Sequence, residues 1–261
     1  MEINFYKYQG TGNDFVILDN RKSDYSKLSR EQIRKLCDRH FGIGADGLML
    51  LNEKKGYDFE MIYFNADGRP GSMCGNGGRC MVKLTYHLGI RKSNYNFLAV
   101  DGAHEARLDD DGIVSLKMQN VDSIELVHND FIVDTGSPHY VKKVPDVMHL
   151  DVVKRGREIR YSKEFEKKGI NVNFVERLSD IDKIIVRTYE RGVENETKSC
   201  GTGVTAAALV SYHNENGFND VEVQTPGGWL NVEFDRLENN KYVNIWLCGP
   251  AEGVFEGTIS I

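Results

Sequence analysis

Strand-like runs recur along the whole chain, and in many of them hydrophobic and polar residues alternate at every second position, as in a strand with one buried face. Gly, Asp and Asn residues, which favour turns, separate the runs. The runs are NFYKYQ (4–9), DFVILD (14–19), GLMLL (47–51), DFEMIYFN (58–65), NFLAVD (96–101), ARLDD (106–110), IVSLKMQ (113–119), DFIVDT (130–135), INVNFVE (170–176), KIIVRTYE (183–190), DVEVQT (220–225), WLNVEFD (229–235) and KYVNIWLC (241–248). The chain is therefore predicted to consist mainly of β-sheet.

Three segments have a helical pattern instead. In SREQIRKLCDRH (29–40), Ser29 is placed to cap the helix, and Gln32 three residues later completes a capping box. The other two segments follow Cys74 and Cys200. The second of these contains VTAAALV (204–210), which is apolar on nearly every side, so we expect it to be the more deeply buried helix.

An internal repeat relates the two halves of the chain. When Cys74 is aligned with Cys200, CGNGGRCMVKLTYHLGI lies over CGTGVTAAALVSYHNEN, with two glycines matched and the Tyr-His pairs at 86–87 and 212–213 at the same offset. A predicted strand precedes and follows each copy. The repeat predicts two pseudo-symmetric lobes, residues 1–124 and 125–261, and the last strand may return to the first lobe.

Composition and charge narrow the possible partners. Of the 261 residues, 40% are hydrophobic and 28% are charged, and the formal net charge is -6. These are ordinary values for a soluble folded protein, and they give no positive field to attract nucleic acid. The most basic run, 142–160, is interrupted by acidic residues and is interpreted as a solvated surface. Without a basic, apolar leader or a long apolar run, the sequence predicts a cytoplasmic protein with no membrane partner.

The five cysteines do not form a recognisable framework. Thiols stay reduced in the cytosol, and an odd number of cysteines without a C-x-x-C pair argues against disulfides, a thiol redox site and a structural zinc site. No metal is therefore expected. Cys37, Cys80 and Cys248 lie within predicted elements and are interpreted as packing residues. The other two invite a chemical interpretation.

Cys74 and Cys200 each lie where a strand turns into a helix. The first N–H groups of a helix have no intrahelical partner and carry partial positive charge, so they bind anions and stabilise a thiolate. The neighbouring glycines would let a substrate approach the backbone and would permit unusual dihedral angles. If the two turns meet between the lobes, two thiols would flank one bound carboxylate.

Such a pair of thiols suits inversion of a carbon next to a carboxylate. One thiolate would remove the α-proton and the other thiol would return a proton to the opposite face, while N–H groups stabilise the enediolate. This chemistry needs no cofactor. A single glycine-rich turn with a cysteine is more often structural, but the duplication favours chemistry. Phosphate binding is disfavoured because neither turn continues as Gly-Lys-Ser/Thr.

The same residues resemble the diaminopimelate epimerase family across nearly the whole chain. The motifs are GTGNDF (10–15), FNADG (64–68), MCGNGGRC (73–80), GSPH (136–139), NVNF (171–174), ERG (190–192) with ET (196–197), SCGTG (199–203), TPGGWLNV (225–232), and GPA (249–251) followed by VFEG. The resemblance implies two pseudo-symmetric α/β lobes, each a curved, mainly antiparallel sheet around a central helix. It also implies epimerisation of LL-2,6-diaminopimelate to the meso form without a cofactor, in lysine and cell-wall precursor biosynthesis, by a homodimer.

Site residues are carried over by position. Cys74 and Cys200 resemble the two acid/base cysteines, and the N–H groups that would bind the reacting carboxylate are those of Gly75, Asn76, Gly201 and Thr202. His139 and Glu190 resemble the polar residues that assist the thiols, and which cysteine each serves stays open. The residues that resemble substrate-binding residues are Asn13, Asn65, Asn171 and Arg191. Arg191 suits a two-pronged contact with the distal carboxylate.

Three departures from the family pattern concern the distal half of the substrate. The family more often has Asn where Ser137 stands, the loop from Arg191 to Cys200 is one residue longer, and GADG (44–47) lacks a glutamine common near that point.

The nearest rival function is a proline racemase or hydroxyproline epimerase, whose motif usually has His where Asn76 stands. A protein of the related phenazine-biosynthesis type would lack the cysteine pair.

Overall fold

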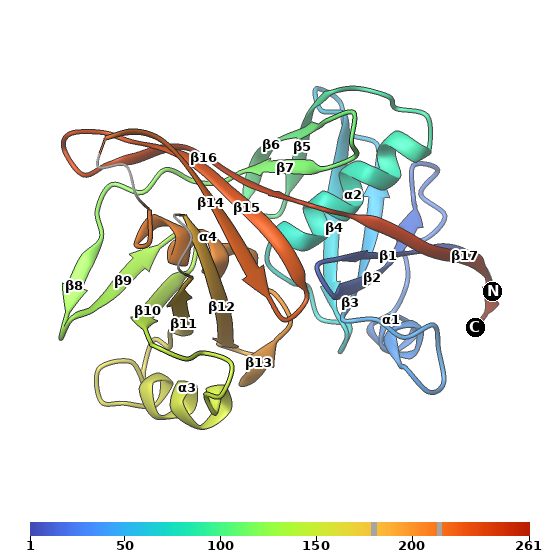
Figure 1. Ribbon diagram of the computed structural model, residues 1–261. Coiled ribbons are helices and arrows are strands. Elements are labelled where there is room, and N and C mark those ends of the chain that lie inside the picture. Colours follow the sequence, from blue (N-terminus) through green and yellow to red (C-terminus); the bar gives the residue numbers. More distant parts are fainter. Residues whose placement is uncertain (179–181, 213–215) are drawn as a thin grey trace. The chain divides into compact units, whose positions relative to one another are not determined.

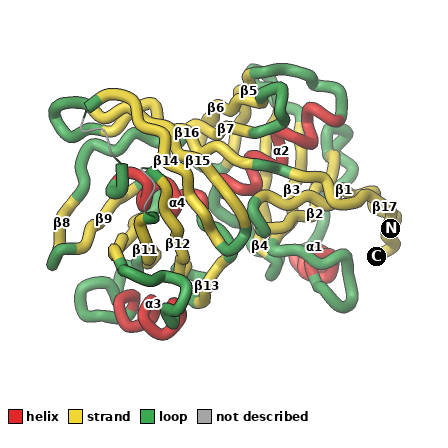
Figure 2. The backbone as a smooth tube through the Cα atoms, in the orientation of Figure 1, coloured by secondary structure: helices red, strands yellow, loops and turns green. Residues whose placement is uncertain are grey.

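The computed structural model describes residues 1–178, 182–212 and 216–261. The described chain divides into two compact units (Figures 1 and 2). The N-terminal unit comprises Met1–Leu116 and Gly249–Ile261, and the C-terminal unit comprises Lys117–Cys248. The predicted division lay near residue 124. Of the repeat used to predict it, His213 lies outside the described residues.

The N-terminal unit is built from β1 (Glu2–Gly10), β2 (Asn13–Asp19), α1 (Arg30–Cys37), β3 (Gly47–Asn52), β4 (Phe59–Asn65), α2 (Gly75–His87), β5 (Asn94–Ala99), β6 (Gly102–Leu108), β7 (Val114–Lys117) and β17 (Glu252–Ser260). Its strands pair in chain order: β1–β2 antiparallel, β2–β3 parallel, β3–β4 antiparallel, β4–β5 parallel, then β5–β6 and β6–β7 antiparallel. β17 returns from the end of the chain and pairs antiparallel with β1.

The C-terminal unit is built from β8 (Glu125–Val127), β9 (Asp130–Asp134), β10 (Pro138–Lys143), α3 (Val152–Arg160), β11 (Asn171–Arg177), β12 (Lys183–Glu190), β13 (Asn195–Thr197), α4 (Gly201–Leu209), β14 (Gly217–Thr225), β15 (Gly228–Arg236) and β16 (Tyr242–Gly249). From β9 onward its pairings repeat the same series: β9–β10 antiparallel, β10–β11 parallel, β11–β12 antiparallel, β12–β14 parallel, then β14–β15 and β15–β16 antiparallel. The helices fall at matching places in the two series.

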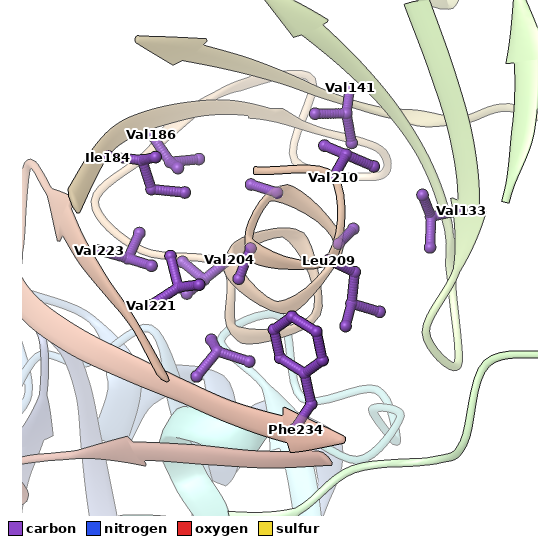
Figure 3. Packing of buried hydrophobic residues seen from close by; sticks show 14 of the residues in the cluster. Val133, Val141, Ile184, Val186, Val204, Leu209, Val210, Val221, Val223 and Phe234 are labelled. Carbon is purple, nitrogen blue, oxygen red and sulfur yellow. The ribbon is translucent and has the colours of Figure 1, made fainter. Parts of the chain in front are cut away.

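One helix forms the centre of each unit. α2 packs against β1, β2, β3, β6 and β17, and α4 packs against β10, β11, β12, β14 and β15. α4 is buried on nearly all sides, as its apolar sequence predicts, and its three consecutive alanines let the strands approach closely. Figure 3 shows Val204 and Leu209 of this helix among valines from the surrounding strands and Phe234.

Sequence signals made by residues close together in the chain predicted the structure correctly. α1 begins after Ser29, and the predicted capping box with Gln32 is confirmed in both directions. The predicted mainly β architecture is also confirmed.

α3 was missed because its charged residues suggested only a solvated surface. Asp151 caps it by accepting from the Lys154 N–H at 3.0 Å, and Gly156 lets the helix lie directly on Tyr189 of β12. No helix in the described part of the chain is long and apolar enough to span a bilayer.

Candidate functional site

Corresponding strand ends carry the candidate residues in both units. In the N-terminal unit, the parallel strands β2 and β3 begin at the end of the sheet where β4 finishes, because Phe15 and Asn65 both pair with Gly47. In the C-terminal unit, β10 and β11 begin where β12 finishes, with His139 paired with Asn171. The chain passes from the end of β4 or β12 toward the central helix, so each cysteine lies close in sequence to such an end.

Cys74 is the N-cap residue of α2, with an extended backbone and part of its surface exposed. Its thiol donates to Oδ1 of Asn13 over 3.5 Å, and the side-chain NH₂ of Asn76 donates to the same oxygen over 3.3 Å. Asn76 is buried and is held in turn by Arg79, whose Nη2 donates to Asn76 Oδ1 at 3.0 Å and to Thr11 Oγ1 at 2.8 Å. Three predicted site residues are therefore joined in one hydrogen-bonded cluster.

Sequence reasoning missed the charged residues behind Asn13. Asn13 Nδ2 donates to Asp46 Oδ2 at 2.7 Å, and Arg39 donates to both Asp46 and Asp14. Lys7 of β1 donates to Asp14 and to the Gly44 carbonyl. Burial alone would raise the pKa of Asp14, but the hydrogen bonds from Arg39 and Lys7 outweigh it and hold the pKa below its ordinary value. No local motif marks Asp46, because strand pairing alone brings it next to Asn13.

Asn65 is placed apart from this cluster. It is exposed at the end of β4, where its side chain donates to the Pro70 carbonyl at 3.4 Å within the 65–70 turn. In GADG (44–47), the segment near which a glutamine was expected, the space beside Gly47 is taken by Tyr63: a Cβ at Gly47 would lie 2.3 Å from that ring. A longer side chain at residue 47 would displace Tyr63.

Cys200 is the N-cap residue of α4 and is also partly exposed. Its Sγ lies 3.5 Å from Thr202 Oγ1, and either atom can be the donor. The Thr202 carbonyl accepts from Thr135 Oγ1 at 2.9 Å, which ties the first turn of α4 to the loop before β10. This contact of Cys200 is with a hydroxyl group, which both donates and accepts hydrogen bonds.

His139 is completely buried on β10 beside the first turn of α4. Burial, with a smaller contribution from the charge of Arg191, lowers the pKa of His139 to about 3, so its ring is neutral near pH 7. The side-chain NH₂ of Asn173 donates to the Tyr140 carbonyl and faces His139 Nδ1 at 3.1 Å. Nδ1 is therefore the acceptor, and the ring proton is on Nε2, a buried atom without a hydrogen-bond partner among the described residues.

Ser137, Asn171 and Arg191 form a second polar cluster in this unit. Asn171 donates to Ser137 Oγ at 2.9 Å and to the Pro138 carbonyl, and its Oδ1 accepts from the Arg191 backbone N–H at 2.9 Å. Arg191 Nη2 also reaches Ser137 Oγ at 3.4 Å, and Nη1 donates to the Lys168 carbonyl. Asn171 thus positions Arg191 and Ser137, while the guanidinium remains exposed.

The longer loop after Arg191 is anchored by Glu194. This residue has a positive φ of 57°. Its carboxylate accepts from the hydroxyls of Tyr161 and Tyr189, each at 3.0 Å, and from the Gly192 N–H. Glu190, at the end of β12, is partly exposed, and its carbonyl accepts from the Glu194 N–H at 2.8 Å. The additional residue is therefore accommodated by a turn attached to α3.

The glycines of the two turns serve packing more than unusual dihedral angles. Gly77 and Gly203 do not have positive φ values, contrary to the expectation from sequence. A Cβ on Gly203 would lie 2.3 Å from Asn173 Oδ1, and one on Gly77 would lie 2.9 Å from Met49 Sδ. Each central helix begins in direct contact with its own sheet, and glycine permits that contact.

The remaining cysteines are buried, in contrast to Cys74 and Cys200. Burial raises the pKa of Cys37 to about 12 and also raises that of Cys80. These two thiols are therefore inert near neutral pH. Among the residues that the structure describes, no three His, Cys, Asp or Glu side chains are grouped closely enough to hold a metal ion.

Comparison with known proteins identifies relatives of the whole chain. The family model described as diaminopimelate epimerase matches residues 5–123 and 131–252. A diaminopimelate epimerase of Flavobacterium psychrophilum is 47% identical over 255 residues, which are 97% of this chain and 99% of the relative. That of Chlorobaculum tepidum is 42% identical over 261 residues, with 97% and 99% covered.

Solved structures resemble the fold at much lower identity. A Bacillus anthracis phenazine biosynthesis protein of the PhzF family has a TM-score of 0.73 and 18% identity, with both chains fully covered. A hydroxyproline epimerase from Agrobacterium vitis has a TM-score of 0.65 and 12% identity, covering 100% of this chain and 93% of its own. At such identities the likeness concerns the fold alone.

Proposed function

Because the chain belongs to the diaminopimelate epimerase family, we propose that it converts LL-2,6-diaminopimelate into meso-diaminopimelate, in lysine and cell-wall precursor biosynthesis. The observation that carries the proposal is that two of the five cysteines, Cys74 and Cys200, are partly exposed N-cap residues of buried helices, whereas the other three are buried. The alternative of a proline-type racemase is not favoured by the relatives.

The proposed reaction uses one thiolate and one thiol. The thiolate takes the α-proton, which breaks a C–H bond and forms an S–H bond. The opposite thiol then gives its proton to the other face of the planar carbanion, so the protonation states of the two cysteines are exchanged after one turnover. Negative charge on the substrate carboxylate would be stabilised by the first N–H groups of α2 and α4, at Gly75, Asn76, Gly201 and Thr202. No cofactor takes part.

We propose that His139 and Glu190 assist the thiols in different ways. A neutral, buried His139 cannot act as an imidazolium acid near pH 7, but its Nε2–H can donate to a thiolate or a developing charge. Glu190 supplies a carboxylate at the end of β12. The substrate itself would be held by Asn13, Asn65 and Arg191, with Arg191 binding the distal carboxylate and Asn171 positioning it.

Location and assembly follow the same proposal. A reaction that depends on reduced thiols suits the reducing cytoplasm, and the five cysteines are thiols rather than disulfides. A homodimer is supported by β17, which pairs with β1 and exposes Val254 and Phe255 by about half. Exposed apolar residues on a strand offer a surface for another copy of the chain.

The test is exchange of the α-hydrogen in deuterated water. The purified protein, with no added cofactor, is incubated with LL-diaminopimelate, L-proline or L-glutamate, and deuterium at the α-carbon is measured by mass spectrometry. We expect incorporation into diaminopimelate alone. Incorporation into proline without any into diaminopimelate would replace the proposed function by its rival.

A further inference from the structure

The amide of Asn13 lies between a carboxylate and a thiol. Its Nδ2 is 2.7 Å from Asp46 Oδ2, and its Oδ1 is 3.5 Å from Cys74 Sγ and 3.3 Å from Asn76 Nδ2. The two ends of an amide have opposite character, since the NH₂ group donates and the oxygen accepts. Which end faces Cys74 therefore determines which protonation state of the thiol is favoured.

Asp46, Asn13, Asn76 and Arg79 form a series of hydrogen bonds, and the two charged residues at its ends fix the orientation of the Asn13 amide. A carboxylate only accepts, so the atom of Asn13 that faces Asp46 must be the NH₂ group. A guanidinium only donates, so Arg79 fixes the oxygen of Asn76 toward itself and leaves the Asn76 NH₂ to donate to Asn13. Both constraints put the carbonyl oxygen of Asn13 on Cys74.

The charged side chains around this series of hydrogen bonds nearly balance one another. Lys7 on β1 and Arg39 after α1 neutralise Asp14 on β2 and Asp46 before β3. On its own helix, Cys74 is accompanied by Arg79 and by Cys80, whose pKa is raised by burial. The helix N-terminus and Arg79 favour a thiolate at Cys74, whereas the Asn13 carbonyl favours the protonated thiol, because an acceptor bonded to the neutral form opposes ionisation.

We propose that Asp46 is a positioning residue that holds the Asn13 carbonyl on Cys74 and so keeps this cysteine protonated in the substrate-free protein. The inference rests on the proposed function in one respect: while it is protonated, Cys74 can act in that reaction as a proton donor and not as the base.

The test is the pH dependence of Cys74 alkylation in the absence of substrate. The protein is treated with iodoacetamide from pH 5 to 10, and the rate at Cys74 is read from its peptide by mass spectrometry. In Asp46→Asn, Arg39 keeps the carbonyl of residue 46 and the new NH₂ group faces the NH₂ group of Asn13, so the hydrogen bond that holds the Asn13 carbonyl toward Cys74 is lost. We expect the Cys74 midpoint to fall by about half to one pH unit, a three- to tenfold gain in thiolate below the midpoint.

Asp67→Asn is the matched control. The Asp67 side chain is 46% exposed against 45% for Asp46, and it also pairs with arginines, Arg30 and Arg69, in the same unit. Its loss should leave the Cys74 midpoint unchanged. Asn13→Ala removes the carbonyl directly, should lower the midpoint in the same direction, and decides the matter if Asp46→Asn does not fold.

Two outcomes would overturn the inference: an unchanged midpoint in the folded variants, or a rate that rises equally at every pH, as simple opening of the site would give. The deuterium-exchange assay is run in parallel. An unmoved midpoint in an active epimerase would reject only the role of Asp46, whereas a shifted midpoint in a protein that does not exchange diaminopimelate would reject only the proposed function.

Discussion

The turns at Cys74 and Cys200 have nearly the same backbone but different chemical neighbours. Both cysteines are N-caps with φ of -117°, and their ψ values are 119° and 108°. Cys74 faces a carbonyl whose orientation is fixed by charged groups, whereas Cys200 faces a hydroxyl that can rotate. Duplication of the fold thus repeats the helix start without repeating the hydrogen-bond partners of the cysteine.

The comparison is tested most strongly by removing each thiol. Cys74→Ala and Cys200→Ala should each reduce epimerisation by at least about a thousandfold, because each removes one of the two proposed acid/base groups, which the other thiol cannot replace. Turnover is measured by conversion of LL- to meso-diaminopimelate, with circular dichroism to confirm folding.

Cys248→Ala is the control for these variants, since it removes a buried thiol that donates to the Trp246 carbonyl over 3.9 Å. It should lose some stability and keep its turnover. Full turnover in either Cys74→Ala or Cys200→Ala would show that the two turns are not a catalytic pair.

A second difference concerns the arginine of each cluster: Arg39 of the N-terminal unit is paired with Asp14 and Asp46, whereas Arg191 of the C-terminal unit donates to Ser137 and to the Lys168 carbonyl. Arg191→Lys should raise KM by about ten- to a hundredfold with little change in kcat, because an ammonium cannot make a two-pronged contact with a carboxylate. Steady-state kinetics provide the measurement. Arg187→Lys is the control, because Arg187 binds Glu196 and backbone carbonyls, and its loss should lower the unfolding temperature instead. Equal KM values for wild type and Arg191→Lys would exclude this residue from substrate binding.

The two helix starts should also differ in how tightly they are packed. Gly203→Ala places a methyl group against Asn173, whose side chain is held by Tyr140 and Thr188, so we expect a loss of about 2 kcal/mol. Gly77→Ala meets the flexible end of Met49, and the better helix propensity of alanine offsets part of the cost, so the loss should be below about 1 kcal/mol. Urea denaturation measures both values, and the reverse order would contradict the packing argument.

Mild acid should weaken the two units at different pH values. His139 has a folded pKa of about 3 against an ordinary value of 6.5, so below pH 6.5 the unfolded chain gains a proton that the folded protein does not. Stability is then lost at up to about 1.4 kcal/mol per pH unit. Asp14 has a lowered pKa, so its contribution is present above its ordinary value of 3.8 and is lost only below it.

Hydrogen exchange at pH 6.5 and 5, corrected for intrinsic rates, can separate these effects. Peptides of β10 should lose protection in this range while those of β2 do not. His139→Gln, which stays neutral, should remove the difference. Earlier loss of protection in β2, or an unchanged response of β10 in the variant, would contradict the assignment to His139.

The sequence was informative wherever a residue acts on its own neighbours in the chain. The Ser29 capping box, the two helices after cysteines and most strands follow from periodicity and turn residues. β10 was missed because Pro138 interrupts its alternation. A last strand returning to the first lobe was expected, but the run that forms β17 was not identified, because several glycines interrupt its alternation. α3 was missed because two buried positions, Val152 and Gly156, are too few to make a clear apolar stripe.

The candidate site could be predicted as far as its motifs extend. Asn13, Cys74 and Asn76 come together as their motifs indicate, but Asp46 and Arg39 join them only through strand pairing. Asn173 was likewise invisible as a partner of His139, because the two residues are 34 positions apart and meet only when β10 and β11 pair. Long-range pairings of this kind leave no local signal in one sequence.

The return of β17 to β1 has a consequence for biosynthesis. The amino group of Met1 donates to the Ile261 carbonyl at 2.7 Å, so the first and last residues of the chain are neighbours. On the ribosome, β1 can pair with β2 early, but its pairing with β17 must wait until residues 117–248 have been made. The half encoded second is therefore the first to possess all of its strands, and the half encoded first is completed last.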